Sequence, residues 1–328
     1  MIIILGIEST AHTFGISIVK DGKILSNVKE SYTTESGGLI PLEVKKHHEN
    51  IAEEVYEKAL KDANITPKNI NAISFSNAPG LAPCLIVGMN FAKQKALELN
   101  VPIIPVNHCI AHLEIGETIG AKDPVMLYVS GANTQIISYE SNKYRVFGET
   151  LDLGVGNFID TIARHANLGF PGGPKIQELA SKSNCLIELP YIIKGMDVSF
   201  SGLQTKIKEL LDKKYPLEDI SFSLQETVFA MLVEVSERAL AHTGKKELLL
   251  GGGVACNIRL KQMCKKMCES RNVKFFCPDN SLLVDNAGMI AYLGWKMFKK
   301  KVYYPIESLN KVDINPKQRT DQVNVNWK

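Results

Sequence analysis

Hydrophobic and polar positions in the first third of the chain follow a regular order of short apolar runs and polar turns. Asp21-Gly22 lies between two apolar runs, and Asp-Gly in that setting is a strong hairpin signal. The pattern predicts, in order, strands at 2–7, 14–19 and 24–28, a Gly/Ser/Thr-rich loop at 31–41, a helix at 45–60, a strand at 70–76, a helix at 85–99, a strand at 101–106 and a further helix that begins near His108.

The same order begins again in the second half of the chain. The pattern predicts strands at 125–129, 135–139 and 144–148, helices near 157–167, 175–182 and 222–241, a strand at 247–250, a helix at 256–269, a strand at 273–277 and a closing helix at 284–298. Each half therefore reads as a hairpin with a small-residue turn, a helical segment, then strand, Gly-rich loop, helix, strand and helix. This order indicates an internal duplication with a period of about 120 residues.

The duplication predicts an α/β protein with two lobes, each built on a mixed sheet flanked by helices. We expect an N-terminal lobe at 1–122 and a C-terminal lobe at 123–304, with the helix at 284–298 near the lobe interface. Residues 305–328 are polar and have no apolar periodicity, so we expect a tail or linker there.

Composition narrows the class of protein. The 328 residues are 45% hydrophobic and 22% charged, an ordinary balance for a globular chain, and the net charge of +3 does not by itself indicate a nucleic-acid binder. The seven cysteines are scattered without a Cys-x-x-Cys pair, which argues against a disulfide framework and favours a reducing cytoplasm. The apolar start, Met1 to Ile7, has no basic leader, and no run reaches the roughly 18 apolar residues of a membrane span.

Two histidines, His108 and His112, are the first candidates for chemistry. If the segment is helical, their i,i+4 spacing places both imidazoles on one face, with Cβ atoms about 6 Å apart. That is half of a metal site, although two histidines that cap and pack a buried helix would have the same spacing. The duplication puts Asp285 at the start of the corresponding helix of the second half. If the halves face each other, Asp285 can meet the two histidines.

Three small-residue turns are candidates for contacts with phosphate, because such turns let backbone N–H groups approach an anion. They lie at corresponding positions of the two halves, which favours a nucleotide between two lobes. The turns are Glu8-Ser9-Thr10, Ser130-Gly131-Ala132 and Gly251-Gly252-Gly253. The last follows an apolar strand and leaves room for a flat base, with Asn257 available to hydrogen-bond the base or the ribose.

Several motifs, in order over residues 2–300, give the chain a specific resemblance. They are Gly6-Ile7-Glu8-Ser9-Thr10-Ala11-His12, Lys46-His47-His48-Glu49-Asn50, Asn107-His108-Cys109-Ile110-Ala111-His112-Leu113, Tyr128-Val129-Ser130-Gly131-Ala132-Asn133-Thr134, Gly154-Val155-Gly156-Asn157-Phe158-Ile159-Asp160, Pro171-Gly172-Gly173-Pro174, Gly251 to Asn257, and Val284-Asp285-Asn286-Ala287-Gly288-Met289. The chain resembles the actin/Hsp70/sugar-kinase superfamily. More narrowly, it resembles the TsaD-type tRNA threonylcarbamoyladenosine transferases in their archaeal and eukaryotic form, once labelled O-sialoglycoprotein endopeptidases.

The resemblance implies one metal ion per chain, iron or else zinc. Its ligands would be His108, His112, Tyr128 and Asp285, a set of nitrogen and oxygen donors that suits either metal. The resemblance also implies a nucleotide ligand, threonylcarbamoyl-adenylate or ATP with magnesium. Its contacts would be Tyr128, Val129, Ser130, Gly131, Ala132, Asp160, Gly173 and Asn257. Family members carry an acidic residue where this chain has Gln177, with Glu178 beside it, so either of these two could take the ribose contact.

The implied reaction transfers a threonylcarbamoyl group from its adenylate to the exocyclic amine of the adenosine next to the anticodon of ANN-decoding tRNAs, and it releases AMP. The implied partners are tRNA and the other subunits of the KEOPS complex, including a small atypical serine/threonine kinase. Some archaeal members continue into this kinase, so the tail at 305–328 could lead to such a domain. The sequence itself identifies no general base.

Three other functions compete with this one. A metallopeptidase of the His-Glu-x-x-His type needs a glutamate after the first histidine, and Cys109 stands there. A small-molecule kinase of the same superfamily would use magnesium on carboxylates and water, not a histidine–tyrosine site. A non-catalytic nucleotide-binding subunit would bind the ligand without transfer.

Overall fold

The computed structural model describes residues 1–34 and 40–328, so residues 35–39 of the predicted loop at 31–41 lie outside the described residues. The chain forms two compact units. The first unit contains residues 1–115 and 285–328, and the second contains residues 116–284.

The first unit is built on a five-stranded mixed sheet in the order β3-β2-β1-β4-β5. Its strands are β1 (Ile3–Glu8), β2 (Thr13–Lys20), β3 (Lys23–Ser31), β4 (Ala72–Ala78) and β5 (Ile103–Asn107). The first three strands are antiparallel, whereas β1, β4 and β5 run parallel. Strand β1 is the central strand and is buried along its whole length, which explains why it is apolar almost throughout.

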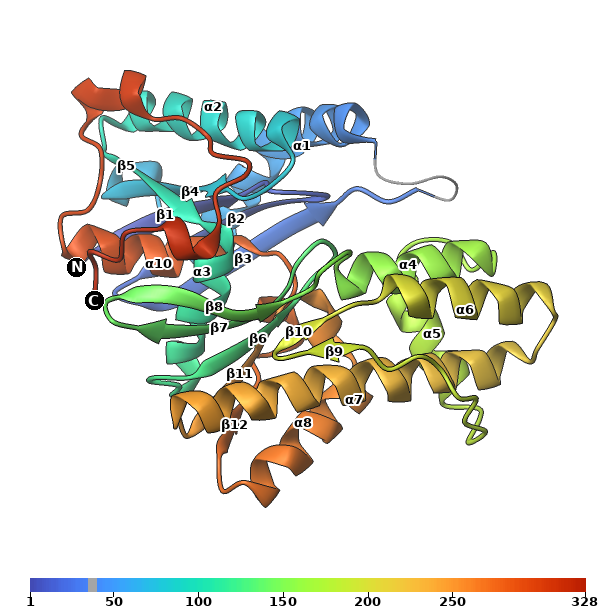
Figure 1. Cartoon of the computed structure of the whole chain (residues 1–328). Helices are drawn as coiled ribbons and strands as arrows, with labels where there is room; N and C mark the ends of the chain where they lie inside the picture. The colour runs from blue at the N-terminus through green and yellow to red at the C-terminus, as the bar shows by residue number, and fades with distance from the viewer. Residues whose placement is uncertain (35–39) are drawn as a thin grey trace. The chain divides into compact units, whose positions relative to one another are not determined.

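Helices cover both faces of this sheet (Figure 1). The helices of the unit are α1 (Pro41–Ala63), α2 (Ala82–Leu99), α3 (His108–Glu114) and α10 (Ala287–Lys299), with single 3₁₀ turns at η1 (Pro67–Asn69), η4 (Ile306–Lys311) and η5 (Thr320–Gln322). In Figure 1, α1 and α2 lie on one side of the sheet and α10 lies on the other. The α1 helix starts earlier than the predicted residue 45 because Pro41 occupies its first turn, a position that proline favours.

The second unit repeats the topology of the first. Its strands are β6 (Val125–Val129), β7 (Thr134–Glu140), β8 (Lys143–Glu149), β11 (Glu247–Gly251) and β12 (Lys274–Phe276), in the order β12-β11-β6-β7-β8. Strands β6 to β8 are antiparallel, and β6, β11 and β12 are parallel. Because both the strand order and the strand directions recur, the predicted duplication is confirmed.

The helices of the second unit are α4 (Val155–His165), α5 (Gly173–Ala180), α6 (Ser201–Asp212), α7 (Leu217–Thr243), α8 (Ile258–Ser270) and α9 (Asn280–Leu283), with a 3₁₀ turn at η3 (Gly253–Cys256). A further 3₁₀ turn, η2 (Ile115–Ile119), spans the boundary at Ile115. A two-stranded ribbon of β9 (Ile193–Lys194) and β10 (Asp197–Val198) precedes α6. Neither this ribbon nor α6 was predicted from the sequence, although Leu203, Ile207 and Leu210 of α6 have helical spacing and are buried.

Asp152 fixes the start of α6. Its carboxylate accepts backbone N–H groups from Phe200 at 3.0 Å and Ser201 at 2.9 Å, and the hydroxyl of Ser199 at 2.6 Å. Burial opposes ionisation, but these donors outweigh it and hold the pKa of Asp152 well below its usual range. The hydrogen bonds thus stabilise the ionised carboxylate, and they stabilise the folded state at every pH at which Asp152 is ionised.

Asp152→Asn is expected to destabilise the protein at pH 7 by about 1 kcal/mol, a small value because the side chain is exposed. A folded-state pKa below the unfolded value of about 3.9 means that this stabilisation is present above pH 4 and is lost as the pH falls further. Urea unfolding of both proteins between pH 7 and pH 3 measures the difference. A difference that stays constant over this range would contradict the role of the carboxylate charge.

The closing helix, α10, belongs to a different unit from the one predicted. The predicted C-terminal lobe at 123–304 included it, whereas α10 packs on the sheet of the first unit. Two glycines allow this close approach: a Cβ on Gly6 of β1 would lie 2.6 Å from the backbone nitrogen of Ala291, and one on Gly294 would lie 2.4 Å from Cβ of Ser74. The boundary of the first unit also falls at Ile115 rather than at 122.

The C-terminal residues differ from a linker as well. Ile103 and Tyr304 exchange backbone hydrogen bonds at 3.0 and 2.9 Å, and the following residues continue along the first unit. Val312 and Trp327 are buried, although the surrounding sequence is polar. The buried positions occur at irregular intervals, so no helical or strand period marks them.

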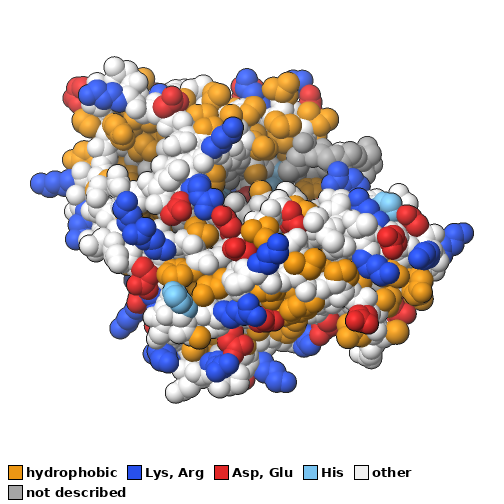
Figure 2. Space-filling model, in the orientation of Figure 1, with side chains coloured by type: hydrophobic (Ala, Val, Ile, Leu, Met, Phe, Trp, Pro, Cys, Tyr) orange, Lys and Arg blue, Asp and Glu red, His pale blue; other side chains and the backbone are white. Residues whose placement is uncertain are grey.

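Charged side chains of both signs are interspersed on the face drawn in Figure 2, in keeping with the net charge of +3. Among residues 1–34 and 40–328, the structure has no helix long and apolar enough to cross a membrane.

Candidate functional site

The two histidines lie on α3, directly after the end of β5. Asn107 ends the strand and caps the helix, because its side-chain oxygen accepts the N–H of Ile110 at 3.2 Å. His108 and His112 then occupy one face of the helix, as predicted, with ring centroids 4.8 Å apart. Both side chains are almost completely buried.

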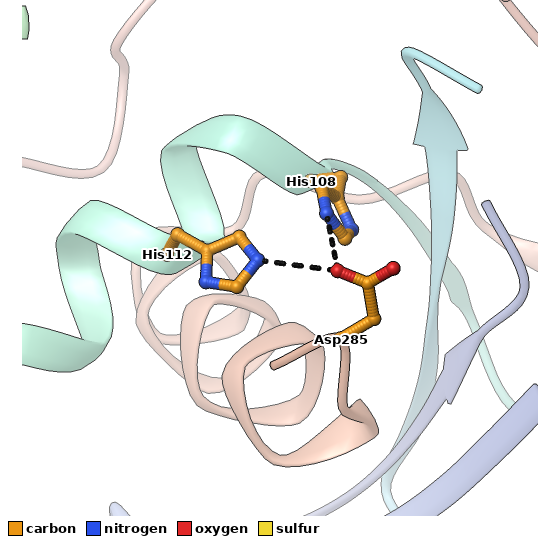
Figure 3. A group of neighbouring side chains, drawn as sticks. All are labelled: His108, His112 and Asp285. Carbon is orange, nitrogen blue, oxygen red and sulfur yellow. Dashed lines mark ion pairs between the residues drawn. The ribbon is translucent and has the colours of Figure 1, made fainter. Parts of the chain in front are cut away.

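Asp285 meets these histidines within the first unit. Its Oδ1 lies 3.3 Å from Nε2 of His108 and 3.6 Å from Nε2 of His112. Figure 3 shows both imidazoles directed from α3 toward the carboxylate, which lies on the segment that leads into α10. One ligand atom from each of the three residues lies within 4.8 Å of the others. The predicted meeting thus occurs, but it occurs because α10 belongs to the first unit and not because two lobes face each other.

Glu8 holds His108 from the opposite side of the ring. Its Oε2 lies 2.9 Å from Nδ1 of His108, and its Oε1 accepts the N–H of Thr10 at 2.7 Å and the hydroxyl of Thr10 at 2.5 Å. Since a carboxylate only accepts, Nδ1 of His108 carries a proton and donates it to Glu8, while Nε2 faces Asp285. The sequence pattern placed Glu8 in a phosphate-binding turn and did not indicate this contact. A signal was available, because a carboxylate ends a strand that is otherwise apolar.

Burial and charge set the protonation states. Burial has the largest effect on Asp285 and would raise its pKa, but His108 beside it holds the pKa well below its usual range. Burial likewise lowers the pKa of His112, so its imidazole is neutral near pH 7. The carboxylates of Glu8 and Asp285 outweigh burial at His108 and hold its pKa well above 6.5. The two carboxylates therefore favour a positive charge on the ring of His108, and a metal ion bound at Nε2 would take the place of the proton there.

This arrangement fits a metal ion. The donors are two imidazole nitrogens and a carboxylate oxygen, which suit a first-row metal such as iron or zinc. A metal-binding histidine commonly donates its other N–H to a carboxylate, and Glu8 accepts from His108 in this way. The three residues could thus hold a metal, with one outer partner already in position.

Tyr128, the fourth predicted ligand, belongs to the second unit. It is the fourth residue of β6, is 1% exposed and pairs with Gly251 of β11. Its assignment to the metal stays a prediction.

Within the second unit, the predicted nucleotide turn lies against backbone that only glycine can provide. Val129 ends β6, and Ser130, Gly131 and Ala132 follow. A Cβ on Gly154 would lie 2.4 Å from the backbone of Ala132. A Cβ on Gly156 would lie 2.7 Å from the carbonyl oxygen of Ser130, and a Cβ on Gly252 would lie 2.3 Å from the carbonyl oxygen of Val129. The Gly-rich loop after β11 and the start of α4 therefore both contact this turn.

The remaining predicted nucleotide residues are linked by short contacts in the same unit. Asp160 on α4 accepts the N–H of Gly172 at 2.8 Å, next to Gly173 at the start of α5. Gln177 on α5 accepts the N–H of Ile258 at 2.8 Å. Asn257, which precedes Ile258 in the chain, caps α8, and its side-chain nitrogen donates to Oε1 of Gln225 on α7 at 3.0 Å. These contacts bring Asp160, Gln177 and Asn257 onto one connected set of elements.

Gln177 and Glu178 have different surroundings. Gln177 contacts the start of α8, whereas Glu178 is exposed and pairs with Lys182 at 2.8 Å along its own helix. Of the two residues that could take the ribose contact, Gln177 is thus the one adjacent to Asn257.

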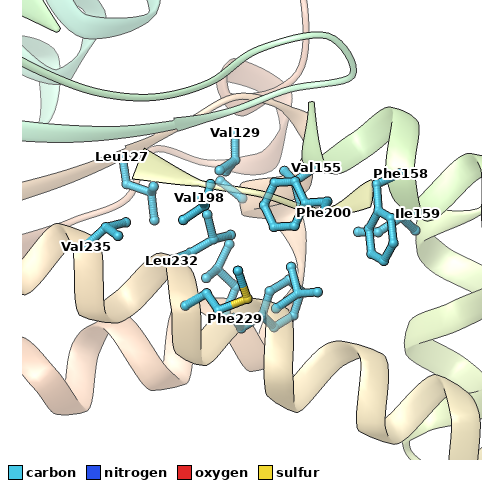
Figure 4. Close-up of a cluster of buried hydrophobic side chains, with 14 of the residues drawn as sticks. Leu127, Val129, Val155, Phe158, Ile159, Val198, Phe200, Phe229, Leu232 and Val235 are labelled. Carbon is cyan, nitrogen blue, oxygen red and sulfur yellow. The ribbon is translucent and has the colours of Figure 1, made fainter. Parts of the chain in front are cut away.

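A hydrophobic core holds these elements in place (Figure 4). Val129 of β6 and Phe158 of α4 belong to the same buried cluster as Phe229 and Leu232 of α7. Figure 4 shows these side chains between α7, α4 and the strands. Because the turn after Val129 and the helix that carries Asp160 share one core, their positions in the unit are coupled.

Two α/β units with the same strand order and strand directions define the class of protein, a duplicated fold of the actin/Hsp70/sugar-kinase type. The crystal structure of HypF from T. kodakarensis is similar in fold, with a TM-score of 0.63 at 16% identity over 89% of this chain and 47% of that chain. The predicted fold class is confirmed.

The particular family follows from sequence comparison. The model of the TsaD family, tRNA N6-adenosine threonylcarbamoyltransferase, matches residues 23–292. The tRNA N6-adenosine threonylcarbamoyltransferase of Thermococcus sibiricus is 52% identical over 99% of this chain and 100% of its own length. A probable bifunctional tRNA threonylcarbamoyladenosine biosynthesis protein of Methanosarcina barkeri is 51% identical, and the match covers 99% of this chain but 59% of that longer protein. The chain belongs to the TsaD family, and the predicted family and transferase class are confirmed.

Proposed function

We propose that this chain transfers the threonylcarbamoyl group from threonylcarbamoyl-adenylate to the exocyclic amine of the adenosine next to the anticodon of ANN-decoding tRNAs, releasing AMP. The observation that carries the proposal is the convergence of His108, His112 and Asp285 on one point, in a chain that belongs to the TsaD family. A tRNA substrate is in keeping with the cytoplasmic location that the scattered free cysteines favour.

His108, His112 and Asp285 would hold the metal, iron or else zinc, and Tyr128 would be a fourth ligand. A bound metal would supply a Lewis acid for the oxygens of the threonylcarbamoyl-phosphate group. Glu8 keeps Nε2 of His108 directed at that point by accepting from Nδ1. The burial of both histidines limits the access of water, which strengthens the interaction of charges there.

The residues of the second unit would bind the adenylate. The turn at Ser130, Gly131 and Ala132 would bind the phosphate through the N–H groups of Gly131 and Ala132, since the N–H of Ser130 donates to the carbonyl of Asn133 at 2.8 Å. Asp160, Gly173 and Asn257 would contact the nucleoside. Adenylate is already a good leaving group, so holding it against the tRNA amine could supply much of the rate acceleration. Tyr128 and Val129 precede the same turn and would contact the threonylcarbamoyl end.

Gln177, rather than Glu178, would contact the ribose. Gln177→Ala is expected to weaken the binding of a non-hydrolysable adenylate analogue by about five- to tenfold, the effect of one hydrogen bond. Glu178→Ala is the matched control and should bind the analogue normally, since its side chain pairs with Lys182. Isothermal titration of both variants provides the measurement. Weaker binding by Glu178→Ala alone would reverse the assignment.

The partners would be tRNA and the other subunits of the KEOPS complex, including a small atypical serine/threonine kinase. The names of the bifunctional relatives, of which this chain covers 59%, support a link to a second activity in those proteins.

The decisive experiment combines the purified chain, its partner subunits, the adenylate and tRNA, and detects the modified adenosine by mass spectrometry of the digested tRNA. Formation of the modified base with release of AMP is expected. No product from a metal-loaded, folded chain would overturn the proposal. Steady ATP turnover on a small molecule would instead favour the kinase alternative, and ligand binding without either reaction would favour a non-catalytic subunit.

A further inference from the structure

A carboxylate with no assigned role lies in the last turn of the histidine-bearing helix. Glu114 of α3 is completely buried, two residues after His112. Burial of a carboxylate is unfavourable unless it is paired, and the C-terminal end of a helix is an unfavourable place for negative charge. Glu114 must therefore be held by strong contacts if α3 is to keep its position.

Those contacts come from α10 and from the C-terminal segment. Lys296 of α10 forms an ion pair with Glu114. Trp327 donates its indole N–H to Oε1 of Glu114 at 3.0 Å in a buried hydrogen bond, and the ammonium group of Lys328 lies 3.8 Å from the same oxygen. Trp327 is 4% exposed, so the ring packs as well as donates.

The other end of α3 contacts the same segment. The side-chain nitrogen of Asn107 donates to Oε1 of Gln318 at 3.2 Å, while its oxygen caps the helix at Ile110. Because one amide group makes both contacts, Gln318 fixes which way the cap faces. A helix of seven residues is too short to be stable alone, so such tertiary contacts determine its position.

The segment that makes these two contacts is itself fixed to the first unit, just before Gln318. The N–H of Asn315 donates to the carbonyl of Asn77 at 2.8 Å, and the N–H of Gly80 donates to the carbonyl of Pro316 at 3.2 Å. Further along, Thr320 is buried. The segment thus has its own attachments and can act as a support for α3.

We propose that the segment from Asn315 to Lys328 positions the metal centre: it holds α3 at both ends, through Gln318 at Asn107 and Trp327 at Glu114, and so keeps His108 and His112 in the geometry that binds the metal. This inference rests on the proposed metal site. Trp327 and Gln318 are positioning residues, since they reach the metal only through the helix.

The test uses Co²⁺ as a probe of the purified chain and compares two tryptophan variants. Trp327→Phe keeps the ring packing and removes only the N–H donor. Trp295→Phe is the matched control, since Trp295 lies on α10, packs on Gly22 and sits under Lys299. The chain has only these two tryptophans. The affinity for Co²⁺ is measured by titration, and the geometry of the site by the visible absorption of the bound ion.

Trp327→Phe is expected to bind Co²⁺ about three- to tenfold more weakly than the Trp295→Phe control and to change the absorption of the bound ion. This is less than the effect of groups bonded directly to a metal ligand. Gln318→Ala should also weaken the affinity for Co²⁺. Because Gln318 is half-exposed, this variant provides the test if Trp327→Phe does not fold. A merely structural role would lower the unfolding free energy in urea and leave both the affinity and the absorption unchanged.

The proposal is overturned if Trp327→Phe and Gln318→Ala bind Co²⁺ with the affinity and the spectrum of the control. His108→Ala separates this outcome from a failure of the metal site itself. If His108→Ala loses Co²⁺ binding while the two tail variants keep it, the metal site stands and only the positioning role fails. If His108→Ala also binds normally, the metal site is refuted together with everything that rests on it.

Discussion

Asp285→Asn is expected to abolish metal binding and to slow threonylcarbamoyl transfer by about two to three orders of magnitude. The Oδ1 atom of Asp285 is the oxygen that both histidines approach, at 3.3 and 3.6 Å. Asparagine keeps the size of the side chain but removes its charge. A metal that acts as a Lewis acid stabilises a transition state by several kcal/mol, and each 1.36 kcal/mol is about tenfold in rate.

The measurement pairs the metal content of the purified variant with the yield of modified adenosine in the reconstituted reaction. Asp62→Asn is the matched control, because Asp62 is an exposed carboxylate on α1 of the same unit. It should retain both metal and activity. Circular dichroism at the working temperature establishes that the Asp285 variant is folded.

The two readouts can also separate the site from the reaction. If Asp285→Asn keeps its metal, the three-residue site is wrong. If it loses the metal and still modifies tRNA at the normal rate, the metal site stands but has no part in the transfer. Only the loss of both supports the proposed chemistry.

The order of strands could be predicted from the sequence because their patterns are local. Asp21-Gly22 marks the first hairpin, and β2 and β3 pair directly across it. The duplication then needed only the recurrence of that order, and the sheets of the two units have the same topology. The buried residues of α6 do have helical spacing, but its start could not be predicted because Asp152, which fixes it, lies 49 residues away in sequence from Ser201.

The site was predictable in part for the same reason. The spacing of His108 and His112 lies within one short helix, so a local pattern contains it. The duplication pointed to Asp285, but it did not predict the unit to which α10 belongs. A helix pattern does not specify which sheet it covers, and here the choice depends on Gly6 and Gly294, where larger side chains would clash.

Contacts between distant residues were the least predictable. Glu114 and Trp327 are 213 residues apart, and nothing in the sequence near either indicates a partner. The C-terminal segment reads as a linker because its few buried side chains, such as Val312 and Trp327, have no period. Glu8 was misassigned because a glutamate before Ser9 and Thr10 has the composition of a polar turn. Its role depends on His108, 100 residues away.

Glu8→Ala is expected to weaken metal binding by about 10- to 100-fold, the usual effect of removing the carboxylate that orients a metal-binding histidine. The side chain of Glu8 is fully buried and contacts Nδ1 of His108 at 2.9 Å. Without it, the ring loses the acceptor that selects the Nδ1–H tautomer. Glu8→Gln keeps an acceptor without the charge, so its metal affinity should lie between the affinities of the wild-type protein and of Glu8→Ala.

Titration with Co²⁺ measures the affinities of the wild-type protein, Glu8→Ala and Glu8→Gln. Glu30→Gln is the control, because Glu30 is exposed near the end of β3. A double-variant cycle in the transfer assay then tests whether Glu8 acts through His108. If it does, adding Glu8→Ala to His108→Ala causes no further loss, because the two residues form one functional pair. A further loss in that background would mean that Glu8 contacts the substrate or the metal itself. Normal Co²⁺ affinity in Glu8→Ala would remove Glu8 from the metal centre altogether.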